Sequence, residues 1–195
     1  MNYTYKQKIN STKNNSKQLS PAEIETHVKN SNEGYEVISE NQPVRPYFDY
    51  DIYYFTEEER EKSFPVDLKR VIDELKTTYD LDKGKLIILT SNGIDTDKQE
   101  AETNRETNLL NEKVKARPNK RTMARLEKPI PYYKNSINII LSGCGYFKSN
   151  NDIIKPQDGT FDKNVYKSYQ LIRLPFATKE GQNRFKSFVF GRSKN

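Results

Sequence analysis

The sequence predicts an α+β fold in a single domain, and two observations support this prediction. Segments with strand character alternate along the chain with segments whose apolar residues recur at helical spacing. In addition, 195 residues are enough to bury a hydrophobic core. The hydrophobic fraction of 33% and the mean hydropathy of -0.98 are low for a globular protein, so we expect some segments to be solvated. We place the folded core at residues 20–190.

The first elements are predicted from composition and from capping signals. Residues 1–19 are rich in Asn, Ser, Lys and Thr and contain few apolar residues, which predicts a mobile polar tail. A helix is predicted to begin at Ser20-Pro21-Ala22-Glu23, with Ser20 as the N-cap and Glu23 completing a capping box. We expect that helix to end between residues 30 and 34.

The central elements are predicted from periodicity. Strands are predicted at residues 35–39 and 44–54, on either side of a turn. Residues 65–79 carry apolar side chains at helical spacing and predict a helix. Residues 85–90 predict a short buried strand that ends at Ser91-Asn92-Gly93.

The second half of the chain begins with an unusual segment. Residues 95–128 are densely charged and poor in apolar residues, and we favour a mobile insertion over an exposed helix. Its basic residues form either a solvated face, which we favour, or a surface for a phosphate backbone. Further strands are predicted at residues 136–141 and 169–174.

Residue counts exclude several kinds of chemistry. Cys144 is the only cysteine, so neither an internal disulfide nor a cysteine-based zinc site can form. His27 is the only histidine, which excludes Ser-His-Asp, Cys-His and His-rich metal sites. We find no long apolar stretch and no signal-peptide core, so we expect an intracellular protein without a membrane partner. Nucleus, cytoplasm and viral replication site are not distinguished, and the net charge of +6 permits a polyanionic partner.

Two carboxylates one residue apart form the first motif. Side chains of a strand alternate between its faces, so Asp49 and Asp51 are expected on one face and Tyr50 on the other. Neighbouring like charges repel, and a divalent cation such as Mg²⁺ or Mn²⁺ removes that repulsion. The alternative interpretation is a pair of solvated acids on an edge strand.

The second motif is a polar face on another predicted strand. Lys134, Ser136 and Asn138 share one face of the segment 134–141, and apolar residues occupy the other. A cation, a hydroxyl and an amide in a row suit the phosphates and the sugar of a nucleotide. An ordinary amphipathic strand is the alternative.

The third motif begins at Phe161-Asp162 and extends to residue 181. Asp162 provides a third acid, while Arg173 and Lys179 provide two cations. Arg173 lies in an apolar strand, where a buried charge is costly without a partner. That partner is either a triphosphate or one of the acids.

Together the three motifs resemble the archaeo-eukaryotic primase superfamily, in particular the branch containing PrimPol and the primase-like proteins of large DNA viruses. That family carries an acidic pair on one strand, Lys-x-Ser-x-His on a second, and an apolar-Asp motif followed by Val-Tyr, Arg-Leu and Lys-x-Gly. Here residues 42–51 resemble the first motif. Phe161-Asp162, Val165-Tyr166, Arg173 and Lys179-Glu180-Gly181 resemble the last. The resemblance covers about residues 35–181, in the family's order.

The resemblance implies a primase-polymerase core with an RRM-like mixed sheet flanked by helices. Asp49, Asp51 and Asp162 would be catalytic residues that hold Mg²⁺ or Mn²⁺, as in the family. The implied reaction is metal-dependent nucleotidyl transfer from nucleoside triphosphates on a single-stranded DNA template, as part of DNA replication. The implied nucleotide-binding residues are Lys134, Ser136, Asn138, Arg173 and Lys179.

The sequence also departs from the family pattern. Asn138 replaces the family histidine and donates from a neutral amide, which would weaken nucleotide binding by about 1 kcal/mol, or roughly tenfold. The chain ends soon after Arg192 without a zinc module or a helicase domain, so we expect a core that either extends primers poorly or works with separate subunits, such as a replicative helicase. The alternative function is a non-catalytic primase-like domain that binds nucleic acid at a replication origin or assists a helicase.

Overall fold

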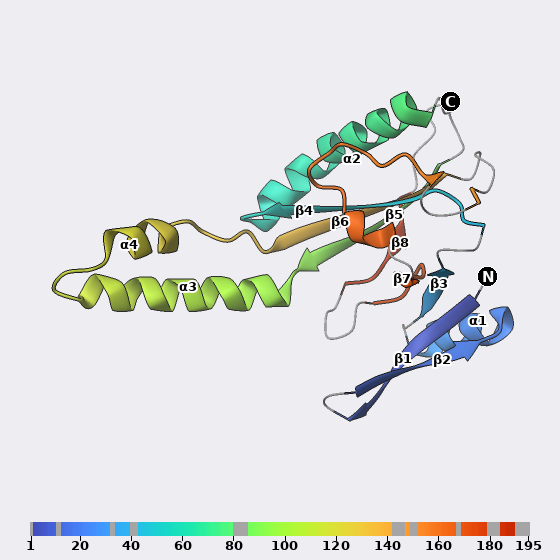
Figure 1. The fold of residues 1–195 in the computed structure, drawn as a ribbon, viewed down its shortest axis with the longest axis horizontal. Helices are drawn as coiled ribbons and strands as arrows, with labels where there is room; N and C mark the ends of the chain where they lie inside the picture. Colours follow the sequence, from blue (N-terminus) through green and yellow to red (C-terminus); the bar gives the residue numbers. More distant parts are fainter. Residues whose placement is uncertain are drawn as a thin grey trace.

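The computed structural model describes residues 2–10, 13–31, 34–39, 43–79, 86–141, 147–148, 152–166, 169–178 and 184–189. Within these ranges the chain forms four α-helices and two four-stranded sheets, which confirms the predicted α+β class (Figure 1). Every strand pair recorded in the described ranges is antiparallel, whereas we expected a mixed sheet. The segment that contains Cys144 lies outside the described residues.

The first sheet has the strand order β2-β1-β3-β7. It is built from β1 (Asn2–Asn10), β2 (Lys13–Leu19), β3 (Tyr35–Ser39) and β7 (Tyr169–Arg173). The prediction of a mobile tail over residues 1–19 is therefore wrong for the described part of that segment. β1 pairs with both β2 and β3 through backbone hydrogen bonds, which do not require the apolar side chains that the composition lacks.

Helix α1 (Pro21–Ser31) begins at the predicted capping box. The backbone N–H of Ser20 donates to Glu23 Oε2 at 2.8 Å, and the backbone N–H of Glu23 donates to Ser20 Oγ at 3.4 Å. These reciprocal bonds satisfy two N–H groups that the first helical turn leaves without partners.

The second sheet has the strand order β4-β6-β5-β8. It contains β4 (Tyr47–Tyr54), β5 (Leu86–Ile94), β6 (Tyr133–Leu141) and β8 (Ser187–Phe188). Helix α2 (Glu57–Tyr79) joins β4 to β5. These two strands run in the same direction because each is antiparallel to β6, which lies between them. The result is a split β-α-β unit of the kind found in ferredoxin-like folds.

β4 and β6 begin within three residues of the prediction, and the two largest differences are the start of α2 and the end of β5. α2 begins at Glu57, before the expected start at residue 65, and Pro65 lies inside it. β5 continues through Ser91-Asn92-Gly93, where we expected it to end. These residues stay extended because they pair with residues 134–136 of β6, and this long-range pairing overrides the local turn signal.

Residues 95–128, expected to be a mobile insertion, form two helices. α3 (Thr96–Val114) begins at Asp95, whose side chain accepts from the backbone N–H of Lys98 at 3.3 Å, and α4 (Lys120–Leu126) is capped by Asn119. Charged residues such as Glu, Lys and Arg are good helix formers, so a segment poor in apolar residues can still be helical when it is capped. Figure 1 shows α3 and α4 extending away from both sheets.

The core lies between α2 and one face of the second sheet. Alternate residues of β4 and β6, including Tyr50 and Ile137, are fully buried together with Val71 and Leu75 of α2. Figure 1 shows α2 lying along this sheet. Because strand side chains alternate, the remaining residues of β4 and β6 point to the opposite face, which α2 leaves uncovered.

None of the helices in the described ranges is long and apolar enough to cross a membrane.

Candidate functional site

The acidic pair lies on the face of β4 that is opposite the core, as predicted. Asp49 and Asp51 are partly buried, and Tyr50 between them is completely buried among aromatic side chains. The ring centroid of Tyr50 is 5.6 Å from that of Phe161. The aromatic core therefore determines the face on which the two carboxylates lie.

The register of β4 and β6 places the second motif directly against the first. Asp49 lies opposite Asn138, and Asp51 lies opposite Ser136. Ser136 Oγ donates to Asp51 Oδ1 at 2.8 Å, and Lys134 Nζ donates to Asp51 Oδ2 at 2.5 Å. Asn138 Nδ2 donates to Asp49 Oδ1. Two motifs separated by more than 80 residues thus form one polar cluster.

Asp162 is brought to the edge of β4 by its backbone. Its N–H donates to the carbonyl oxygen of Asp49 at 2.8 Å, and the isolated bridge between Tyr50 and Phe161 holds the same segment. The side chain of Asp162 accepts from the backbone N–H and from the side-chain amide of Asn164, both at 2.9 Å. The third acid is therefore next to the pair in the backbone, but its carboxylate stabilises the short helix η2 (Lys163–Tyr166).

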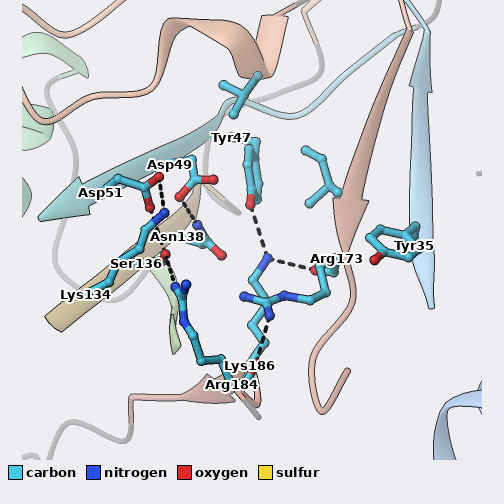
Figure 2. Close-up of a pocket in the computed structure, with 12 residues that line it drawn as sticks. Tyr35, Tyr47, Asp49, Asp51, Lys134, Ser136, Asn138, Arg173, Arg184 and Lys186 are labelled. Carbon is cyan, nitrogen blue, oxygen red and sulfur yellow. Dashed lines mark hydrogen bonds and ion pairs between the residues drawn. The ribbon is translucent and has the colours of Figure 1, made fainter. Parts of the chain in front are cut away.

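Three cations approach the acids from the C-terminal part of the chain. Arg184 and Lys186 are 2% and 1% exposed, and both precede β8. Arg184 donates to Ser136 Oγ at 3.0 Å, and Lys186 Nζ donates to the Arg173 carbonyl at 2.7 Å and to Tyr47 Oη at 3.2 Å. Arg173 in turn donates to the Arg184 carbonyl at 2.8 Å. Figure 2 shows these side chains around the same space as the acidic pair.

Together these groups line a cavity of about 270 Å³ between the two sheets. Six of the eight predicted site residues line it, whereas Asp162 does not. Lys179 lies outside the described residues, so its predicted role is not tested. The polar and charged lining is Asp49, Asp51, Lys134, Ser136, Asn138, Arg173, Arg184 and Lys186, with Tyr35, Tyr47, Val165 and Ile172.

Sequence reasoning missed Arg184 and Lys186. The available signal was the alternation in Arg184-Phe185-Lys186, which puts both cations on one face of an extended segment. The local sequence gave no sign of which element these two residues would approach. Gly93 provides the space, because a Cβ at this position would lie 2.8 Å from Arg184 Cγ.

The lining is electrostatically suited to a bound anion. Four cations face two carboxylates, so the cavity has an excess of positive charge. Burial lowers the pKa of Lys186, which Asp49 opposes, and burial together with the nearby Arg184 lowers the pKa of Arg173. An anion in the cavity would offset the free-energy cost of burying these cations, because it would pair with charges that are already desolvated.

One of the two carboxylates has an oxygen that a cation could contact. Burial, together with the charge of Asp51, raises the pKa of Asp49. No hydrogen bond to Asp49 Oδ2 is recorded within the described residues, so this oxygen can accept a new ligand. Hard carboxylate oxygens are the donors that Mg²⁺ and Mn²⁺ prefer. Among the described residues, however, no three His, Cys, Asp or Glu side chains are grouped closely enough to hold a metal ion.

No protein-family model and no curated protein sequence matches this chain.

Proposed function

We propose that this protein is a primase-polymerase core of the PrimPol-like type, which transfers nucleotides from triphosphates to a strand on a single-stranded DNA template. One observation carries the proposal. Residues from three motifs, picked out in the sequence by their order, line a single cavity together with two further buried cations. Accidental matches on separate elements would not be expected to converge in this way.

Each part of the cavity has a role in this proposal. Asp49 and Asp51, with Asp162 at the edge of β4, would hold the divalent cations. When bound, such cations stabilise the attacking hydroxyl and the leaving pyrophosphate in phosphoryl transfer. Arg184 and Lys186 would bind the triphosphate, and because they are buried their positions are defined before the nucleotide arrives.

Lys134 and Ser136 have two roles in turn. In the structure both donate to Asp51, which neutralises and orients that carboxylate. The ammonium group of Lys134 would pair with a phosphate oxygen when Asp51 is engaged in holding a cation. Asn138 holds Asp49 with a neutral amide, where the family has a histidine, so we expect weaker nucleotide binding than in a variant with histidine.

A second candidate function is a non-catalytic primase-like domain that binds nucleic acid. The observation that favours it is the set of bonds already made by the acids. Both oxygens of Asp51 accept hydrogen bonds, and the carboxylate of Asp162 is engaged by Asn164. In this function the carboxylates would be structural, and the proposed partners would be DNA and a separate replicative helicase.

Primer synthesis and extension on single-stranded DNA, with Mn²⁺ or Mg²⁺ and labelled nucleotides, separates the two functions. We expect product from the unchanged protein, none from Asp49→Asn/Asp51→Asn, and more from Asn138→His. The control is Asp73→Asn/Glu58→Gln, which removes two exposed carboxylates from α2. Absence of both product and metal-dependent nucleotide binding in every variant would exclude the catalytic function and leave the binding domain.

A further inference from the structure

The arm formed by α3 and α4 carries a concentrated positive charge. Residues 113–128 contain seven Lys or Arg and one Glu, so their net charge equals the +6 of the whole chain. All seven basic side chains are exposed, and we call them the basic cluster: Lys113, Lys115, Arg117, Lys120, Arg121, Arg125 and Lys128. Within the described residues only Lys115 has a recorded ion pair, with Glu112. Six cations of this cluster are therefore available to a partner.

The arm has a defined shape, because buried polar contacts hold its two helices together. Arg105 donates to both carboxylate oxygens of Glu102, each at 2.5 Å, and also to the carbonyl of Leu126 at the end of α4. The other link is the backbone N–H of Ile130, which donates to Glu102 Oε2 at 2.9 Å. A run of charged residues that was only solvated would not need these contacts. α3 has 19 residues and so carries the basic cluster about 28 Å from its first turn.

The N-terminal end of α3, which we call the root of the arm, lies beside the candidate site. Tyr53 donates to Asp95, the N-cap of α3, at 3.1 Å, and Lys98 Nζ lies 3.3 Å from the centre of its ring. Lys134 Nζ of the site lies 5.1 Å from the centre of the same Tyr53 ring. One aromatic side chain therefore connects the cavity to the arm.

A second cavity, of about 440 Å³, lies at this root. Phe55, which is 50% exposed, and Tyr132 line it together with residues of α3. Phe55 follows β4 directly and is about 13 Å from Asp51 along the strand. Proteins bind single strands by stacking unpaired bases on aromatic rings while phosphates pair with cations. A strand of several nucleotides would join Phe55 at the root to the basic cluster at the far end of α3.

We propose that the arm is a docking surface for single-stranded nucleic acid, with bases stacking at Phe55 and Tyr132 and the phosphate backbone following the basic cluster. The inference rests on the proposed function, because it identifies the surface that would hold the template strand. A duplex offers no free base faces to the cavity. A membrane surface fits less well, because α3 lacks the continuous apolar face of an interfacial helix.

The test is binding of a fluorescent oligothymidylate of about 16 nucleotides, measured by anisotropy without nucleotide or metal. If six cations contact phosphates, the logarithm of affinity should fall with the logarithm of salt with a slope of about -4. Between about 50 and 200 mM salt this is a loss of roughly 300-fold. Because nothing catalytic is required, failure of primer synthesis with binding intact would overturn the proposed function alone.

Three cations of the basic cluster are removed in the variant Arg117→Gln/Lys120→Gln/Arg121→Gln. This variant should halve the salt slope and weaken oligonucleotide binding about 100-fold at 0.1 M salt. The control, Lys29→Gln/Lys62→Gln/Lys69→Gln, removes the same charge from exposed positions on α1 and α2 and should leave affinity within a few-fold. An equal loss in both variants would mean that net charge alone drives binding and would overturn the proposal.

Phe55→Ala tests the stacking half of the inference. Loss of one stacked base should weaken binding by about 5- to 150-fold without changing the salt slope. Phe185→Ala, at a residue that is 48% exposed, is the matched control and should bind normally. Tighter binding of duplex DNA, or binding of phosphatidylserine vesicles in place of the oligonucleotide, would also overturn the proposal.

Discussion

Replacement of Lys186 by methionine separates a functional cation from a structural one. The side chain is 1% exposed and donates to Tyr47 Oη and to the Arg173 carbonyl. Methionine has a similar length and fills the same space, but it removes the charge and both donated hydrogen bonds. If Lys186 is positioned for a triphosphate, the variant should lose nucleotide binding and still fold.

The expected magnitudes follow from the contacts. Tyr47 Oη and the Arg173 carbonyl each lose a donor. Each loss costs about 1–3 kcal/mol in the free energy of unfolding when the acceptor is buried. Removal of a desolvated cation returns free energy on the order of this loss, because burial, which Asp49 only partly opposes, lowers the pKa of Lys186. We therefore expect the melting temperature to change by less than about 5 °C. A lost hydrogen bond between a charged amine and phosphate is worth about 1.5–3 kcal/mol, so nucleotide affinity should fall roughly 10- to 150-fold.

The assay pairs thermal unfolding with anisotropy of a fluorescent nucleoside triphosphate in Mn²⁺. Lys62→Met makes the same chemical change at an exposed position of α2 and should leave both measurements nearly unchanged. A large fall in melting temperature of Lys186→Met, with nucleotide affinity retained, would refute the reasoning. Lys186 would then be a structural cation that neutralises the buried acids.

Three further predictions concern the fold around the site. Gly93→Ala should lower the melting temperature by about 2–10 °C in thermal unfolding, because φ is +149° there and the new Cβ would meet the side chain of Arg184 at 2.8 Å. Glu23→Ala removes half of the capping box and should cost about 0.5–1 kcal/mol in the free energy of unfolding measured with urea. The Arg105 guanidinium lowers the pKa of Glu102 from its ordinary 4.5, so the ion pair that orients Arg105 toward the Leu126 carbonyl of α4 is fully present above that pH and is lost as pH falls through the lowered value. The protection factors of the α4 amides, corrected for the intrinsic exchange rate at each pH, should therefore fall at acid pH in the unchanged protein, and this acid-dependent fall should be absent in Glu102→Gln.

Some of the candidate site could be predicted from local sequence. The period-two alternation of β4 predicted that Asp49 and Asp51 share a face and that Tyr50 is buried, because strand geometry imposes alternation whatever the partner strand. The capping box of α1 is equally local, since its two hydrogen bonds join residues three positions apart. Nothing outside those segments is needed for either feature.

Other local signals were misleading because long-range pairing overrode them. The polar N-terminal segment forms β1 and β2, and β3 provides a pairing partner for β1. Residues 91–93 carry a turn signal but are extended because they pair with β6. The charged segment 95–128 became helical through caps and through the contact of Glu102 with Arg105. In the first two cases the deciding contact joins residues that no short window contains together, whereas the caps and the Glu102–Arg105 ion pair are local contacts.

The sequence by itself determined which side chains are acidic, basic or aromatic and which of them share a strand face. Only the tertiary structure decided that Asp51 lies opposite Ser136 and that Arg184 reaches the same cavity. The physical reason is that strand register depends on burying the apolar face of the sheet under α2, and that buried contacts between distant segments form only when the whole core closes. Local spacing encodes the faces, whereas closure of the core determines which faces meet.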